Sequence, residues 1–297
     1  MSATIPPLLS PEFMNKLEQL ELVSRKMLVG RFKGDRLSKR KGSSVEFADH
    51  RHYAMGDDLR FLDWNLYARL DRLFIKLFLE EEDLHIHLLI DQSLSMDFGT
   101  PTKLHYAKQV AAALGFVGLI NLDRVGVYSF GVDLDKKSSG LRGRASTWRL
   151  MRFLDEMPPA EGTGNLRQAL KTFSLQAPRR GITVIISDFM DKEGFEEPLR
   201  YLLARQMDVY AIQVLAPEEI DPEIVGDLRL IDVEDEDVAE VTVSSVLLKR
   251  YRQNLAGFRG AMQQFCTARG IAYLFTSTQE PFDRLVLNYL RKRGLLR

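Results

Sequence analysis

The sequence predicts an α/β fold with a doubly wound, mostly parallel sheet, preceded by an N-terminal accessory segment. From residue 84 onward, apolar runs of strand length alternate with amphipathic helical segments, as in parallel strands that helices cover on both faces. With 297 residues, of which 45% are hydrophobic, the chain can bury a sizeable core. Residues before 84 are more polar and lack this alternation, so we expect them to form a separate region.

Apolar periodicity assigns the elements in order along the chain. In the first 82 residues we expect a helix over 12–29, a basic loop over 31–44 and a strand over 74–78. Further along, strands are expected over 84–90, 125–130, 182–187, 209–215 and 271–276. Helices are expected over 103–122, 147–157, 165–173, 195–205, 244–269 and 281–293. The domain prediction is therefore an accessory segment over 1–82 and an α/β domain over 83–297, with an acidic hairpin inserted over roughly 218–243.

Composition and charge exclude several classes of protein. The 41 basic residues balance the 41 acidic ones, which argues against a uniformly basic nucleic-acid-binding protein. No stretch approaches the ~20 apolar residues that a membrane-spanning helix needs, and no secretory signal pattern is present at the N-terminus. A single cysteine, Cys266, cannot form an intrachain disulfide, so a cytoplasmic, reducing setting fits best.

The balanced charge is unevenly distributed along the chain. Residues 25–41 hold eight basic side chains and one acidic one, whereas residues 218–240 hold eleven acidic side chains and one basic one. Each run can be a solvated face or a docking surface for an oppositely charged partner.

Oxygen-bearing side chains stand at the ends of two predicted strands and before one predicted helix. Asp91, Ser93 and Ser95 follow the first of these strands, Thr163 precedes the helix, and Asp188 follows the second strand. Ligands in doubly wound sheets bind outside the carboxyl ends of the strands, and oxygen donors suit Mg²⁺ or Mn²⁺. The alternative is that these residues are helix caps and turn formers.

Taken together, these five residues strongly resemble the metal-ion-dependent adhesion site of von Willebrand factor A-type domains. The resemblance implies that Ser93 and Ser95 bind the metal directly. It also implies that Thr163, Asp91 and Asp188 bind it either directly or through water.

A second motif carries a resemblance to one bacterial family of such domains, encoded beside MoxR-type AAA+ ATPases. The matching residues are Arg51, Tyr53, Gly56, Asp57, Asp58, Arg60, Asp63, Trp64 and Arg69, and the resemblance extends over roughly residues 25–215. It implies a von Willebrand factor A-like fold and a non-catalytic adaptor that acts with a MoxR-type AAA+ ATPase and its client protein. The implied role is the assembly or maturation of other proteins.

The second motif also has a purely structural interpretation. Gly56, Asp57 and Asp58 suit a turn, and Trp64 suits a packing anchor. Three arginines can neutralise three aspartates in an ion-pair network; these are Arg51, Arg60 and Arg69 with Asp57, Asp58 and Asp63. A separate binding site is the alternative.

Two pairs of histidines also require interpretation. His50 and His52, like His85 and His87, are two residues apart and therefore lie on one face of a strand. A zinc site would need further nitrogen or sulfur ligands, which the neighbouring sequence does not supply, so structural histidines are expected.

The competing functional class is a Mg²⁺-dependent phosphohydrolase with Asp91 as nucleophile. Such an enzyme needs a second carboxylate two residues on as acid and base, where this chain has Ser93. A phosphate-binding loop of the G-x-x-x-x-G-K-[ST] type is also missing from the sequence. We therefore expect a protein that is not an enzyme.

Overall fold

The computed structural model describes residues 8–20, 46–79, 84–159, 164–176, 179–224, 226–231, 238–290 and 295. The chain forms two compact units, one of Met1–Arg25 with Leu84–Arg297 and the other of Lys26–Asp83. The predicted basic loop over 31–44 lies outside the described residues.

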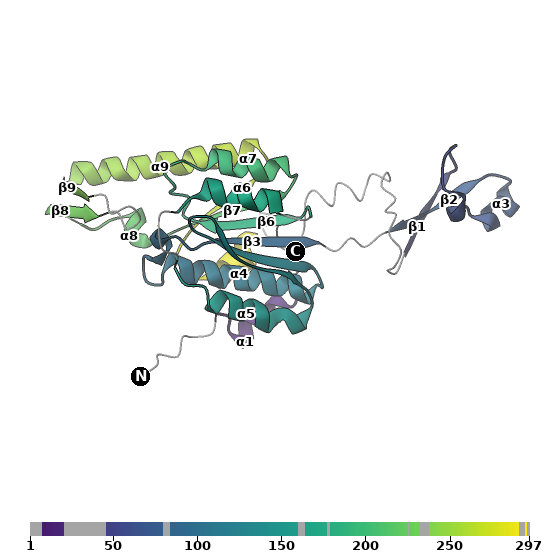
Figure 1. Ribbon diagram of the computed structural model, residues 1–297, viewed down its shortest axis with the longest axis horizontal. Helices are drawn as coiled ribbons and strands as arrows, with labels where there is room; N and C mark the ends of the chain where they lie inside the picture. The colour runs from purple at the N-terminus through teal and green to yellow at the C-terminus, as the bar shows by residue number, and fades with distance from the viewer. Residues whose placement is uncertain are drawn as a thin grey trace. The chain divides into compact units, whose positions relative to one another are not determined.

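A six-stranded sheet forms the centre of the first unit, in the order β10-β7-β6-β3-β4-β5 (Figure 1). All neighbouring strands are parallel except β5, which is antiparallel to β4. The strands are β3 (His85–Asp91), β4 (Arg124–Phe130), β5 (Leu134–Leu141), β6 (Ile182–Ser187), β7 (Asp208–Leu215) and β10 (Ala272–Ser277). From β3 the chain moves to β4 on one side and later returns to β6 on the other, so the strand order reverses between β3 and β6.

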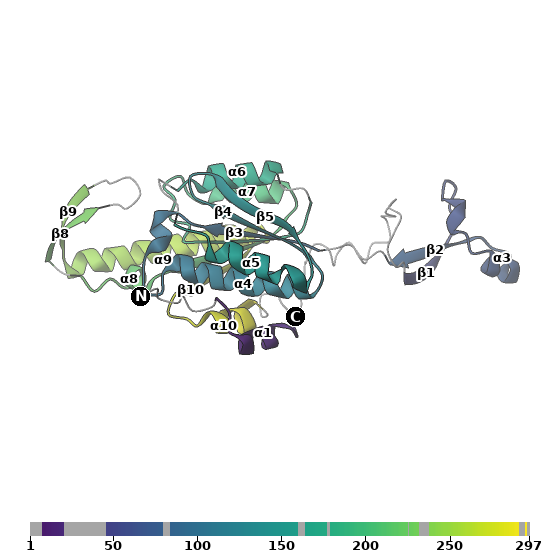
Figure 2. The same ribbon diagram turned by 60° about the horizontal axis from the view of Figure 1, so that its bottom comes forward.

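Helices cover both faces of this sheet (Figures 1 and 2). One face carries α1 (Pro11–Leu17), α4 (Lys103–Ile120), α5 (Thr147–Asp155) and α10 (Phe282–Arg284), and the other carries α6 (Leu166–Gln176), α7 (Glu196–Ala204) and α9 (Ser245–Ala268). Successive β3 side chains enter opposite layers: Leu88 and Ile90 join the core on the α4 face, and Leu89 joins the core on the α6 face. The predicted doubly wound, mostly parallel α/β fold is therefore confirmed.

Helix α1 belongs to the sheet unit, although the sequence assigned it to the accessory segment. Phe13 and Leu17 are buried in the same core as α4, and the Phe13 ring packs edge-to-face on Phe282 with 5.2 Å between centroids. The helix ends at Leu17, so the predicted helix over 12–29 is too long where the structure describes it; residues 21–29 lie outside the described part.

The remaining short elements of this unit lie in its connections. These are 3-10 turns at Leu94–Asp97 and Arg144–Ser146, helix α8 (Pro217–Ile220), and a π-helical turn at Leu285–Leu290 that directly follows α10. Strands β8 (Gly226–Ile231) and β9 (Val238–Val243) form an antiparallel hairpin, which Figure 2 shows beside the end of α9 that begins at Ser245. The hairpin was predicted, but its acidic tip at 232–237 lies outside the described residues.

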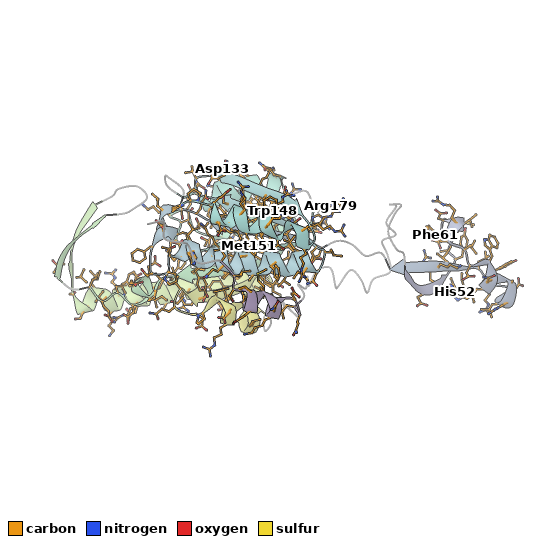
Figure 3. The ribbon with its side chains drawn as sticks, turned by 90° about the horizontal axis from the view of Figure 1, so that it is seen from below. His52, Phe61, Asp133, Trp148, Met151 and Arg179 are labelled. Atoms are coloured by element: carbon orange, nitrogen blue, oxygen red, sulfur yellow. The ribbon has the colours of Figure 1, made fainter. Side chains whose placement is uncertain are left out.

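The second unit contains a two-stranded antiparallel sheet of β1 (Glu46–His52) and β2 (Phe74–Leu79). Between these strands the chain forms a 3-10 turn (Leu59–Phe61) and helix α3 (Trp64–Leu70). Side chains of this unit are drawn in Figure 3, where His52 and Phe61 are labelled; the His52 ring packs on Phe74 with 4.5 Å between centroids. The sequence predicted β2 and placed His50 and His52 on a strand, which is β1, but it gave no bounds for β1 and missed α3.

Trp64 differs from its predicted role as a packing anchor. Its side chain is 64% exposed, and it meets the Tyr67 ring edge-to-face at 6.2 Å. Trp64 is the first residue of α3, a helix that Asp63 caps and in which no residue is buried.

Within the described residues, no helix combines the length and apolar character needed to cross a membrane.

Candidate functional site

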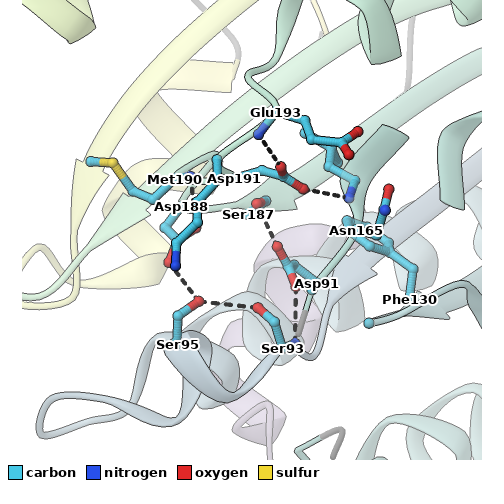
Figure 4. Close-up of a pocket in the computed structure, with 14 residues that line it drawn as sticks. Asp91, Ser93, Ser95, Phe130, Asn165, Ser187, Asp188, Met190, Asp191 and Glu193 are labelled. Carbon is cyan, nitrogen blue, oxygen red and sulfur yellow. Dashed lines mark hydrogen bonds between the residues drawn. The ribbon is translucent and has the colours of Figure 1, made fainter. Parts of the chain in front are cut away.

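A cavity of about 350 Å³ lies at the carboxyl ends of β3 and β6, where the strand order reverses (Figure 4). Four of the five predicted ligands, Asp91, Ser93, Ser95 and Asp188, line it. Thr163, the fifth, lies outside the described residues, and its neighbour Gly164 lines the cavity. Ser95 and Asp188, which are 93 positions apart in the chain, meet here because parallel strands end at the same edge of the sheet.

Asp91 is the last residue of β3 and is 7% exposed. Its Oδ1 accepts a hydrogen bond from the Ser93 backbone N–H at 2.9 Å, and its Oδ2 accepts one from Ser187 Oγ at 2.6 Å. Burial is the main reason that the pKa of Asp91 is raised to about 7, and the negative charge of Asp188 contributes further. A cation in the cavity would reverse this effect, since it favours the ionised carboxylate.

Ser95 connects the two strand ends. Its Oγ donates to Asp188 Oδ2 at 3.0 Å and lies 3.1 Å from Ser93 Oγ (Figure 4). The loop after β6 is itself fixed, because Asp188 Oδ1 accepts from the Met190 N–H at 3.0 Å. The Asp188 carbonyl also accepts from Gln213 Nε2 at 2.8 Å. The Ser95 hydroxyl therefore lies within hydrogen-bonding distance of both the Ser93 hydroxyl and the Asp188 carboxylate.

A buried lysine stands behind the loop after β6. Lys103, the first residue of α4, is fully buried, and its Nζ lies 2.7 Å from Asp188 Oδ2 and 2.7 Å from Glu219 Oε1. Burial favours the neutral amine, but the charges of Asp188 and Glu219 outweigh it and raise the Lys103 pKa. The ammonium is therefore a permanent positive charge beside the candidate ligands.

Asp191 also lines the cavity and binds the backbone of two neighbouring segments. Its Oδ2 accepts from the Leu166 N–H at 2.8 Å, and its Oδ1 accepts from the Glu193 N–H at 2.7 Å (Figure 4). The carboxylate thereby caps the start of α6 and is committed to backbone donors. We assign it a structural role.

The donor set suits a hard divalent cation. Hydroxyl and carboxylate oxygens are the ligands that Mg²⁺ and Mn²⁺ prefer. Asp91, Asp188 and Glu219 carry three negative charges when ionised, and Lys103 offsets one of them, which leaves the charge that one divalent cation neutralises. Among the described residues, no group of three or more His, Cys, Asp and Glu side chains is placed to hold a metal, so a cation bound here would also need the serine hydroxyls.

Sequence reasoning missed three residues of this site: Ser187, Lys103 and Glu219. Ser187 directly precedes a predicted ligand. Lys103 had a signal too, because a lysine in the first turn opposes the helix dipole and needs a compensating partner. Glu219 carried no signal, since it lies among eleven acidic residues of one run.

The predicted ion-pair network of the second unit is present in altered form. Arg51 binds Asp57 through two hydrogen bonds of 2.8 and 2.7 Å, and Arg60 pairs with Asp58. Asp63 contacts His50 Nε2 at 2.9 Å and Lys76 Nζ at 3.5 Å. Among the described residues, none of the ion pairs of the three aspartates involves Arg69, which the predicted network included.

The other predicted members of this motif have backbone roles. Tyr53 donates its backbone N–H to the Leu73 carbonyl at 3.0 Å, and Gly56 adopts a φ of +104° in the turn. That φ is one that side chains rarely allow, which explains the glycine. The ion pairs, the Tyr53 hydrogen bond and the Gly56 turn are consistent with a structural role for this motif in the second unit.

His85 and His87 stack on each other with 6.2 Å between ring centroids. His87 is buried against Tyr128 and Phe173, and its Nε2 lies 3.2 Å from the Arg179 carbonyl. It is thus a hydrogen-bonded core residue.

This strand order, with hydroxyl and carboxylate side chains gathered at the switch point, defines a doubly wound α/β domain with a candidate ligand site at the end of its central strands. The chain belongs to the family described as "Protein of unknown function DUF58", whose model matches residues 49–259. The uncharacterized protein Rv1480 of Mycobacterium tuberculosis is 30% identical over 292 residues, which cover 96% of this chain and 92% of the relative.

Solved structures with similar folds have low sequence identity. The conserved hypothetical protein BatB from Bacteroides thetaiotaomicron is 16% identical, covering 71% of this chain and 98% of its own, with a TM-score of 0.43. The von Willebrand factor A domain of SpRpn10 is 11% identical, covering 69% of this chain and 94% of its own, with a TM-score of 0.41.

Proposed function

We propose that this protein is a non-catalytic, metal-ion-dependent adaptor that binds a partner protein through Mg²⁺ or Mn²⁺ at the Asp91 site. The observation that carries the proposal is the position of Ser95 Oγ. It lies 3.1 Å from Ser93 Oγ and 3.0 Å from Asp188 Oδ2, and so joins the ends of β3 and β6. Ser93, Ser95, Asp91 and Asp188 would hold the cation, together with Thr163.

The chemistry of these donors favours binding of an external ligand. When bound, the cation supplies an electrophilic coordination position that accepts a carboxylate oxygen from a partner Asp or Glu. The serine hydroxyls are neutral, so they bind the cation without adding negative charge to the site. The adjoining cavity of about 350 Å³ leaves room for a partner side chain.

The resemblance to the family encoded beside MoxR-type ATPases supports a particular partner. We propose that the adaptor works in the cytoplasm with a MoxR-type AAA+ ATPase and its client, in the assembly or maturation of protein complexes. The acidic run at 218–240 and the basic run at 25–41 are candidate secondary contacts, and such contacts weaken as salt screens them.

Metal binding tests the first half of the proposal. Calorimetric titration of the wild-type chain with Mg²⁺ and with Mn²⁺ should show one site. Asp91→Ala should abolish it, whereas Asp97→Ala, an exposed aspartate of the same loop, should leave it unchanged. Equal binding by both variants would remove the Asp91 site from consideration.

Partner binding tests the second half. A pull-down with the MoxR-type ATPase in millimolar Mg²⁺ should lose the partner in EDTA, in Ser95→Ala and in Thr163→Ala. Association that is equally tight in all four conditions would refute the metal-mediated contact. Assays with nucleotides and p-nitrophenyl phosphate complete the test: turnover that disappears in Asp91→Asn would instead assign the phosphohydrolase class.

A further inference from the structure

Lys103 occupies a position that local physical chemistry disfavours. It is fully buried, and lysine is almost never fully buried unless it is paired. It also stands in the first turn of α4, where the helix dipole repels a positive charge. Violations of local preference of this kind concentrate at functional sites.

Two fixed carboxylates compensate for this placement. Asp188 Oδ2 accepts from both Lys103 Nζ and Ser95 Oγ. Glu219 Oε1 accepts from Lys103 at 2.7 Å, while its Oε2 accepts from the Ala216 N–H at 2.7 Å. The Glu219 carbonyl further accepts from Tyr251 Oη at 2.6 Å. The ammonium is thus held between the candidate metal site and helix α8.

We propose that Lys103 and Glu219 are positioning residues that set the affinity of the Asp91 site for its divalent cation. This inference rests on the proposed function. Lys103 supplies a resident positive charge that competes with the cation for Asp188. Glu219 forms a second ion pair with the Lys103 ammonium, which weakens the pairing of Lys103 with Asp188. It also adds a negative charge beside the site.

The two residues therefore act in opposite directions. Removing the charge of Lys103 leaves Asp188 and Glu219 without their counter-ion, so a divalent cation should bind more tightly. When Glu219 loses its charge, Asp188 becomes the sole carboxylate partner of Lys103 in this cluster, so the ammonium competes more strongly with the cation. The cation should therefore bind more weakly. At an effective dielectric constant near 20, one charge at this range changes affinity by roughly tenfold or more.

The test compares two variants of α8 in which a glutamate is replaced by an uncharged glutamine. Glu219→Gln should weaken Mg²⁺ binding about tenfold in calorimetric titrations of the full chain. Glu218→Gln changes the same charge on an exposed neighbour and should stay within about twofold of wild type. Equal affinities of Glu219→Gln and Glu218→Gln would overturn the inference.

Lys103→Met supplies an independent measurement. Thermal unfolding in EDTA should show a lower Tm than wild type, since two carboxylates lose their counter-ion. Added Mg²⁺ should raise its Tm by more than it raises that of the wild type, and an equal or smaller rise would contradict the inference. If Lys103→Met does not fold, the Glu219→Gln and Glu218→Gln pair still decides.

The outcomes separate this inference from the proposed function. Absence of Mg²⁺ binding in the wild type overturns both. Binding that Asp91→Ala abolishes and Glu219→Gln does not weaken overturns the affinity-setting role alone.

Discussion

Ser187 donates a hydrogen bond to Asp91, with 2.6 Å between Oγ and Oδ2. Both side chains are buried, and the bond joins the last residues of β6 and β3. The same Oγ accepts from the Phe189 N–H at 2.9 Å, so one hydroxyl orders both the carboxylate and the turn that follows β6. Ser187 therefore positions Asp91 without being one of the predicted ligands.

Ser187→Ala should destabilise the metal-free protein. The substitution leaves a buried carboxylate oxygen without its donor, and such a loss costs about 1–3 kcal/mol of unfolding free energy. Urea denaturation in EDTA measures it. Ser129→Ala is the matched control: Ser129 is buried in β4, and its Oγ has no hydrogen-bond partner among the described residues. The control should be neutral or stabilising, and an equal loss in both variants would refute the role of Ser187.

Gly181→Ala should also destabilise the fold. A Cβ at Gly181 would lie 2.0 Å from the His85 carbonyl oxygen, so the start of β6 would have to move away from β3. Overpacking of this kind costs about 1–3 kcal/mol.

Gly257→Ala in α9 provides the contrast. A Cβ there meets nothing within 4 Å, and alanine is the better helix former by about 0.8–1 kcal/mol. Urea denaturation should therefore show the two Gly→Ala changes shifting stability in opposite directions. A stabilised Gly181→Ala variant would contradict the close approach of β6 to β3.

The sheet could be predicted from sequence because its central strands are buried on both faces. Every residue of β6 and β7 is buried, and such strands appear as continuous apolar runs. The edge strand β5 was missed because its sequence, LDKKSSGL, has no apolar run or alternation. Strand β1 was indicated only by the spacing of His50 and His52, and its bounds were not predicted, since EFADHRH is mostly polar.

The candidate site was only partly predictable. Asp91, Ser93, Ser95 and Asp188 follow predicted strands, and parallel strands bring their carboxyl ends together. Pairing of Lys103 with Glu219 joins residues 116 positions apart, and no sequence periodicity indicates such a contact. The metal-binding role of the predicted residues stays a prediction.

Trp64→Ala should leave stability almost unchanged. The Trp64 side chain is 64% exposed, and exposed substitutions away from special contacts usually shift unfolding free energy by no more than about 0.5 kcal/mol. Ile75→Ala is the comparison in the same unit: Ile75 is 1% exposed, and truncating a buried isoleucine costs about 2–5 kcal/mol. Denaturation followed by circular dichroism measures both. A large loss in Trp64→Ala would restore the tryptophan to its predicted anchoring role.

His87 should make stability fall as the solution is acidified. Burial lowers its pKa from 6.5 to about 4, because Tyr128 and Phe173 pack on the ring and desolvate the charged form, and the charge of His85 lowers the pKa further. In the unfolded chain the imidazole takes up a proton near pH 6.5, whereas the folded protein resists protonation until about pH 4. The stabilisation is therefore complete above pH 6.5 and is lost as the pH falls toward 4, by about 3 kcal/mol in total.

Urea denaturation between pH 7 and pH 4 checks this expectation. His87→Gln removes the titrating group and keeps a polar side chain, so its stability should fall less steeply over that interval than that of the wild type. If His87→Gln and wild type lose stability in parallel, another group is responsible for the acid sensitivity, and the neutral, buried state assigned to His87 is wrong.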